Sequence, residues 1–188
     1  MDDSLAVSED TIRTTVGDLA LPRMGVVEQI WETDPISAEE IESRAASATS
    51  DLDFDHVPDG GEVAIGAGSR GIANLGTIVR GVAAGVREQG YDPFVFPAMG
   101  SHGGATAEGQ REKLNTLCVS EETVGCEIRA TMDVETVGRT PERDVPVYAD
   151  ANAVAADAIV MVNRIKPHTD FGGEVESGLS KMLVIGMG

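Results

Sequence analysis

Short apolar runs alternate with longer amphipathic stretches through the middle of the chain. Runs rich in Val, Ile, Phe and Ala predict buried strands at 62–68 and 92–100, and a short helix feeding a third strand within 151–167. Between these runs the pattern predicts one helix over 69–90, closed by Gly90, and another over 105–118, capped by Thr106. Because strands alternate with helices, we expect an α/β fold with a mainly parallel sheet flanked by helices.

The N-terminal part of the chain has a different pattern. Its first thirty residues suggest short strands and turns that end in an apolar stretch. Ser37 with Glu40 three positions later forms a capping-box pattern, which predicts the start of a helix. We therefore divide the chain into residues 1–61, expected to pack on the core, and residues 62–188, which form the α/β domain.

Three further elements are expected in the C-terminal half. Residues 126–138 and 145–150 alternate as strands do, and residues 176–186 resemble the start of a helix. The apolar end of this segment suggests that it buries against something else, either a missing C-terminal domain or a second copy of the chain.

Charge changes the picture of possible partners. The chain has 32 acidic and 14 basic residues, a net charge of −18, and only three lysines (Lys113, Lys166 and Lys181). Nucleic acid and anionic membranes would be repelled by such a surface, so both are excluded as partners. Scarce lysine together with abundant acid favours a halophilic, salt-adapted protein, and the alternative is an ordinary acidic cytosolic protein.

The sequence shows no pattern typical of a targeting signal, a membrane span or a cysteine-based metal site. The acidic start has no apolar core as a signal peptide would, and the apolar runs are too short to span a bilayer. Cys118 and Cys126 have no metal-knuckle spacing and are expected to be small buried side chains. We therefore expect a cytoplasmic protein.

Unusual residues follow three of the predicted strands. Arg70 follows the first, His102 precedes a pair of glycines after the second, and His168 follows the third shortly before Gly172 and Gly173. Parallel strands bring their carboxyl ends to one edge of a sheet, where ligands bind, so these side chains are expected to share a cleft. Taken singly, each has an equal claim to a structural role in its loop. The remaining histidine, His56, has no such context and is expected on the surface.

Lys181 stands out among the few cations. It follows a glycine-rich bend in the otherwise small and apolar stretch "SGLSKMLVIG". A lysine there suits either covalent attachment of a cofactor or binding of an anion. Other motifs are weak or missing: "GAGSRG" matches a dinucleotide loop imperfectly, and no P-loop, zinc knuckle or nucleophile elbow is present.

Three segments together resemble a known enzyme family. They are "GSRGIANL", "PAMGSHGGATAEGQ" and "VNRIKPHTDFGGEVESGLSKMLVIGMG". They resemble the nickel-pincer lactate racemase family, in its broad branch of uncharacterised homologues. The resemblance runs from about Glu62 to Gly188 and covers the N-terminal part of the family's Rossmann-like catalytic domain.

The resemblance implies an isomerase, a racemase or epimerase of 2-hydroxy acids. Its cofactor would be a nickel pincer nucleotide derived from nicotinic acid, which accepts the substrate hydrogen as hydride and returns it on the opposite face. By motif, His102 and His168 match the two acid/base histidines, and Lys181 matches the lysine that carries the cofactor. The resemblance further places Gly172, Gly173 and Ser177 at the cofactor and Arg70, aided by Lys166, at the substrate carboxylate.

The chain also departs from the family pattern. The spacing from His168 to Lys181 is longer than in lactate racemase itself, so the resemblance implies a 2-hydroxy acid without specifying lactate. The family's nickel-binding histidine lies beyond the lysine, and no histidine follows Lys181 here. We therefore expect a domain that is incomplete at its C-terminus, inactive as 188 residues alone. The alternatives are a non-catalytic module that binds a nucleotide or organic anion, and an inactive truncated remnant.

Overall fold

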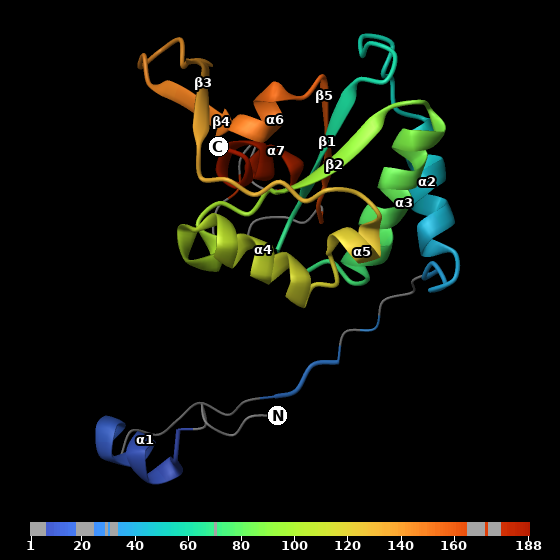
Figure 1. Cartoon of the computed structure of the whole chain (residues 1–188). Coiled ribbons are helices and arrows are strands. Elements are labelled where there is room, and N and C mark those ends of the chain that lie inside the picture. The colour runs from blue at the N-terminus through green and yellow to red at the C-terminus, as the bar shows by residue number, and fades with distance from the viewer. Residues whose placement is uncertain are drawn as a thin grey trace. The chain divides into compact units, whose positions relative to one another are not determined.

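The protein is described by a computed structural model that divides into two compact units, Met1–Pro35 and Ile36–Gly188 (Figure 1). The structure describes residues 7–17, 25–28, 30, 34–69, 71–164, 172 and 178–188.

The first unit contains one helix, α1 (Glu9–Val16), in its described part. The Ser8 hydroxyl caps it by accepting a hydrogen bond from the backbone N–H of Thr11. The prediction of short strands and turns was wrong for this segment. Ile12 and Val16 lie four residues apart, which is a helical spacing, and the serine cap precedes them.

A three-stranded parallel sheet forms the centre of the second unit. Its order is β2 (Asp92–Pro97), β1 (Glu62–Ala67) and β5 (Ala158–Val162), with Ile65 of β1 opposite Val95 and Val160. The predicted α/β fold with a parallel sheet flanked by helices is therefore confirmed.

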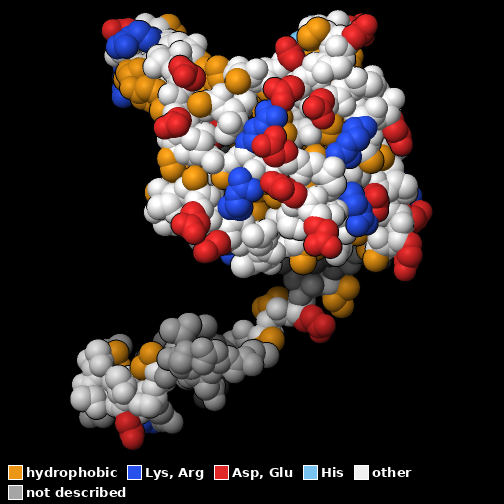
Figure 2. Space-filling view, in the orientation of Figure 1, with side chains coloured by type: hydrophobic (Ala, Val, Ile, Leu, Met, Phe, Trp, Pro, Cys, Tyr) orange, Lys and Arg blue, Asp and Glu red, His pale blue; other side chains and the backbone are white. Residues whose placement is uncertain are grey.

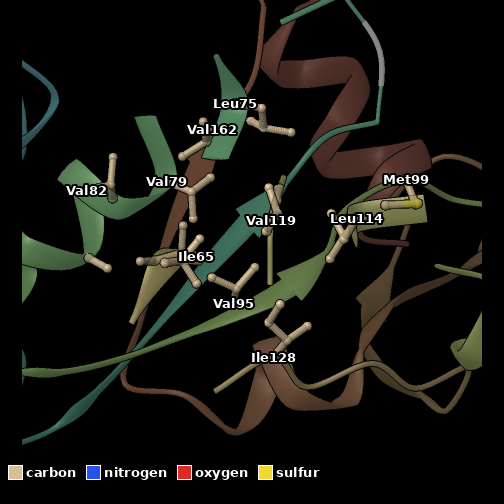
Figure 3. Packing of buried hydrophobic residues seen from close by; sticks show 13 residues of the cluster. Ile65, Leu75, Val79, Val82, Val95, Met99, Leu114, Val119, Ile128 and Val162 are labelled. Atoms are coloured by element: carbon tan, nitrogen blue, oxygen red, sulfur yellow. The ribbon is translucent and has the colours of Figure 1, made fainter. Parts of the chain in front are cut away.

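One face of the sheet is covered by three helices. These are α3 (Leu75–Glu88), α4 (Ala107–Thr116) and the short α5 (Glu121–Val124), which the sequence pattern did not reveal. Ile65 and Val95 on the strands pack with Val79 of α3 and Leu114 of α4 in the main hydrophobic cluster (Figure 3). All four side chains are fully buried, so this cluster anchors the sheet to its helices.

The other face is covered by α6 (Ala151–Ala155) and the C-terminal segment. Phe94 and Phe96 of β2 are buried there with Ala153 and the partly buried Met187. The C-terminal segment consists of α7 (Leu179–Lys181) followed directly by a π-helical turn, Met182–Gly186. The helix predicted over 176–186 thus exists in its described part.

Helix α2 (Ile41–Ser50) packs on α3 at Gly81 and Gly85 of α3. A Cβ on Gly81 would lie 2.4 Å from the Glu42 carbonyl oxygen, so the two backbones approach as closely as glycine allows. The capping box predicted from Ser37 and Glu40 was wrong: the Ser37 hydroxyl donates to the Glu40 carboxylate at 2.9 Å, but the N-cap residue is Glu40 and no side chain caps the helix. The helix begins only after Glu40, because residues 38–40 form a turn first.

The two other predicted strands form a hairpin apart from the main sheet. β3 (Val134–Arg139) pairs antiparallel with β4 (Pro146–Asp150), and every residue of β3 is exposed (Figures 1 and 2). The predicted strand at 126–138 therefore forms only in its second half, while Ile128 makes an isolated bridge to Val95. The hairpin carries exposed apolar side chains, including Val137 and Tyr148.

The strand order places β1 between its two successors. The chain leaves β1, crosses through α3 to β2 on one side, and later reaches β5 on the other side. The carboxyl end of β1 is therefore a topological switch point, the position where ligands bind in open α/β sheets.

Candidate functional site

A cavity of about 270 Å³ lies at this edge of the sheet. Its wall combines the residues that follow β1, β2 and β5 with the C-terminal helical segment. The described lining residues are Ser69, Met99, Gly100, Ser101, His102, Asn163, Arg164, Gly178, Lys181, Met182, Ile185 and Gly186. Two residues selected from the sequence, His102 and Lys181, are thus brought together from distant parts of the chain.

The imidazole ring of His102 is held by a residue at the end of the neighbouring strand β1. It begins the 3-10 turn His102–Ala105 after β2, and its Nδ1 atom forms a hydrogen bond with the Oγ atom of Ser69, which follows β1. Ser69 is buried and His102 is half-buried. A hydroxyl can donate to an unprotonated imidazole nitrogen and accept from a protonated one, so this bond persists in both states of the ring. The contact fixes the ring orientation.

The glycines after His102 have mainly a backbone role. Gly103 has a φ of 69°, and a Cβ there would lie 2.4 Å from the carbonyl carbon of Gly109 in α4. The loop is also tied to α4 by Gln110, whose buried side-chain amide donates to the Gly100 carbonyl at 2.7 Å. The loop that presents His102 is therefore fixed against a helix.

Lys181 reaches the cavity because the C-terminal helical segment packs against the end of β2. The Gly100 N–H donates to the Gly186 carbonyl at 3.2 Å. A Cβ on Gly186 would lie 2.8 Å from the Ala98 carbonyl oxygen, so only glycine permits this approach. Lys181 is exposed and lines the cavity.

The cavity is unusually free of acid for this protein. None of its described lining residues is Asp or Glu, although the chain carries 32 acidic residues. Arg164 and Lys181 supply positive charge, and neither takes part in an ion pair within the described part of the chain. This local balance of charge favours an anionic ligand.

Several predicted site residues lie outside the described residues. They are Arg70, Lys166, His168, Gly173 and Ser177. Gly172 is described as an exposed residue in neither a helix nor a strand. The sequence reasoning, in turn, missed Ser69, Asn163 and Arg164, which the structure places in the cavity wall.

The other candidate residues lie away from this cavity. His56 is exposed, as predicted. Cys118 is also exposed, so the prediction that it is buried was wrong: it follows α4 in a left-handed conformation with a φ of 59° and faces outward. Cys126 is half-buried, and burial raises the pKa of its thiol although Arg87 opposes the shift.

The described part of the chain offers neither a metal cluster nor a membrane-spanning helix. The described residues include no group of three or more His, Cys, Asp or Glu side chains able to hold a metal ion. None of the described helices is both long and apolar enough to cross a membrane. Comparison with protein-family models, curated proteins and solved structures finds no match to this chain.

Proposed function

We propose that the cavity is the N-terminal part of the active site of an isomerase, a racemase or epimerase that inverts a 2-hydroxy acid. The domain would be Rossmann-like, as the motif resemblance implies. The single observation that carries this proposal is that His102 and Lys181 line one cavity at the switch point of a parallel sheet.

The proposed reaction needs both a hydrogen carrier and a proton acceptor. The C2–H bond of a 2-hydroxy acid is too weakly acidic for a side chain to break directly. A nickel pincer nucleotide, when bound, supplies the missing chemistry by accepting hydride from C2 and returning it on the opposite face. His102 would take the hydroxyl proton of one enantiomer as C2 loses hydride, so that a neutral 2-oxo acid carbonyl forms, and His168 would protonate that oxygen when hydride returns to the opposite face. In the reverse direction the two histidines would exchange these roles.

The described residues fit the organic part of such a cofactor. Lys181 is an exposed residue of the cavity wall, which suits a covalent tether. Arg164 adds positive charge at the same wall, which suits a nucleotide's phosphate or the substrate's carboxylate. The metal would be held mainly by the cofactor itself, because the described residues offer no cluster of three or more ligating side chains.

A further domain or a second copy of the chain would complete the site. The C-terminal helical segment supports this part of the proposal, because Leu183, Val184 and Ile185 on it remain 43%, 68% and 58% exposed. Adjacent exposed apolar side chains of this kind commonly mark a contact surface.

The proposal is tested by following a panel of enantiopure 2-hydroxy acids with chiral chromatography. The protein is expressed in its native host, where its cofactor and any partner are made. His102→Gln should lower interconversion by about 10²- to 10⁴-fold, the usual contribution of general acid/base catalysis. The matched control, His56→Gln, changes an exposed histidine that does not line the cavity and should leave the rate unchanged. Saturable binding of these acids without interconversion would favour the non-catalytic anion-binding module.

A further inference from the structure

Asn163 carries a buried hydrogen-bond donor that has no acceptor among the described residues. It follows β5 directly, and its Oδ1 atom accepts the backbone N–H of Arg164 at 2.8 Å. An N–H cannot donate to the amide NH₂, so this contact fixes which end of the side chain is oxygen. The Nδ2 atom is fully buried and has no hydrogen-bond partner among the described residues.

A donor in this state calls for an explanation. Buried polar groups nearly always have a partner, since burying one without a partner costs its full desolvation penalty. Asn163 lines the cavity next to the proposed reaction centre, so a small rotation of its side chain would bring this N–H to an acceptor oxygen of a bound molecule. The Asn163 side chain also packs closely against Gly68, the residue that follows β1, because a Cβ on Gly68 would lie 3.3 Å from the Asn163 Oδ1 atom.

The surroundings specify the charge of that acceptor. Arg164, the next residue, also lines the cavity, and its Nη1 atom lies 3.5 Å from the Gly71 carbonyl oxygen after β1. The described cavity wall contains no carboxylate that would compete for either side chain. An amide donor beside a guanidinium matches the two oxygens of a carboxylate.

We propose that Asn163 and Arg164 together bind the carboxylate of a small organic acid. That this acid is the 2-hydroxy acid substrate rests on the proposed function, whereas the anion site itself does not. The cavity of about 270 Å³ is at the small end of ligand pockets, which suits a molecule of this size.

The test is a titration of the ¹⁵N-labelled chain with L-lactate and, separately, with inorganic phosphate. The side-chain amide signal of Asn163 is assigned by its loss in Asn163→Leu, and its shift reports binding directly. Lactate should bind saturably, and Asn163→Asp and Arg164→Gln should each weaken its affinity by about tenfold to 150-fold, the cost of one charged hydrogen bond. Asn163→Leu serves as the second variant if Asn163→Asp does not fold.

Matched controls make the same chemical changes elsewhere. Asn115→Asp in α4 and Arg143→Gln in the hairpin loop alter exposed residues outside the cavity and should leave lactate affinity unchanged. Tighter binding of phosphate than of lactate at this amide would overturn the carboxylate assignment. Absence of any shift, or equal affinity in all variants, would overturn the site and indicate that only water satisfies the amide.

These outcomes are independent of the chemistry proposed above. If lactate binds at Asn163 but the protein interconverts no 2-hydroxy acid, the anion site stands and the proposed enzyme activity is wrong. If the protein interconverts these acids at an unchanged rate in Asn163→Leu, the enzyme activity stands and the role of Asn163 in binding the substrate is wrong.

Discussion

The contact between Gly100 and the C-terminal helical segment should be essential to the cavity, and Gly100→Ala tests this. Gly100 follows β2 with a φ of 58°, and a Cβ there would lie 2.5 Å from the Ile185 carbonyl oxygen. The new methyl group would therefore push the segment that carries Lys181 away from the loop that carries His102.

The expected cost has two parts. An L-residue in the left-handed region costs about 1–2 kcal/mol, and forcing a methyl group into a packed contact costs about 1–3 kcal/mol more. Gly100→Ala should therefore destabilise the protein by about 2–5 kcal/mol. Gly60→Ala is a matched control, because Gly60 has a φ of 71° with no heavy atom within 4 Å of its Cβ position. It should cost only the first part, about 1–2 kcal/mol.

Thermal unfolding followed by circular dichroism measures both variants. For a unit of this size the midpoint should fall by roughly 4–20 °C in Gly100→Ala and by roughly 2–8 °C in Gly60→Ala. Only Gly100→Ala should also lose binding of lactate in the titration described above. Equal losses of stability in both variants, with lactate binding intact in both, would refute the close approach of the C-terminal segment.

Three further predictions concern charge and burial. Burial raises the pKa of Asp150, although hydrogen bonds from the backbone N–H groups of Ala153 and Asn152 oppose the shift. The carboxyl therefore contributes stability that is fully present below its ordinary pKa of 3.8 and is lost as the pH rises through the folded-state pKa. Asp150→Asn keeps an oxygen for the cap of α6 and should gain urea stability over the wild type from pH 4 to pH 7, whereas a difference independent of pH would contradict this. Cys118 should react with a thiol reagent well before Cys126, whose pKa is raised by burial, and equal rates would contradict the described exposures. Raising KCl from about 0.1 to 1 M shortens the Debye length from about 10 to about 3 Å and should raise the unfolding midpoint of this protein of net charge −18, while an unchanged midpoint would argue against salt adaptation.

Two strands of the central sheet, β1 and β2, could be predicted because they are buried on both faces. β1 and β2 are continuous apolar runs bounded by turn residues, a local pattern that needs no knowledge of partners. The β3–β4 hairpin could be predicted as strands, but its position apart from the main sheet could not, because that depends on contacts with residues far away in the sequence. Its alternation of polar and apolar residues is equally compatible with a sheet edge and with a separate hairpin.

The candidate site could be predicted in part, because the strands that position it could be predicted. The rule that ligands lie at the carboxyl ends of parallel strands selected His102 correctly as a cavity residue. Applied one residue after the run "AIVMV", it would also have selected Asn163 and Arg164, which were overlooked in favour of the more reactive His168. The role of Ser69 could not be predicted, because its bond to His102 joins two strand ends whose adjacency only the sheet order reveals.

The most direct test of the proposed enzyme is a peptide mass map of the protein purified from its native host. The account predicts a covalent increment on the peptide that contains Lys181, lost in Lys181→Arg and retained in Lys113→Arg, a control for the same substitution outside the cavity. An unmodified Lys181 in a preparation that interconverts 2-hydroxy acids would contradict the tether. An unmodified Lys181 in a preparation without that activity would contradict the enzyme altogether and favour the anion-binding module.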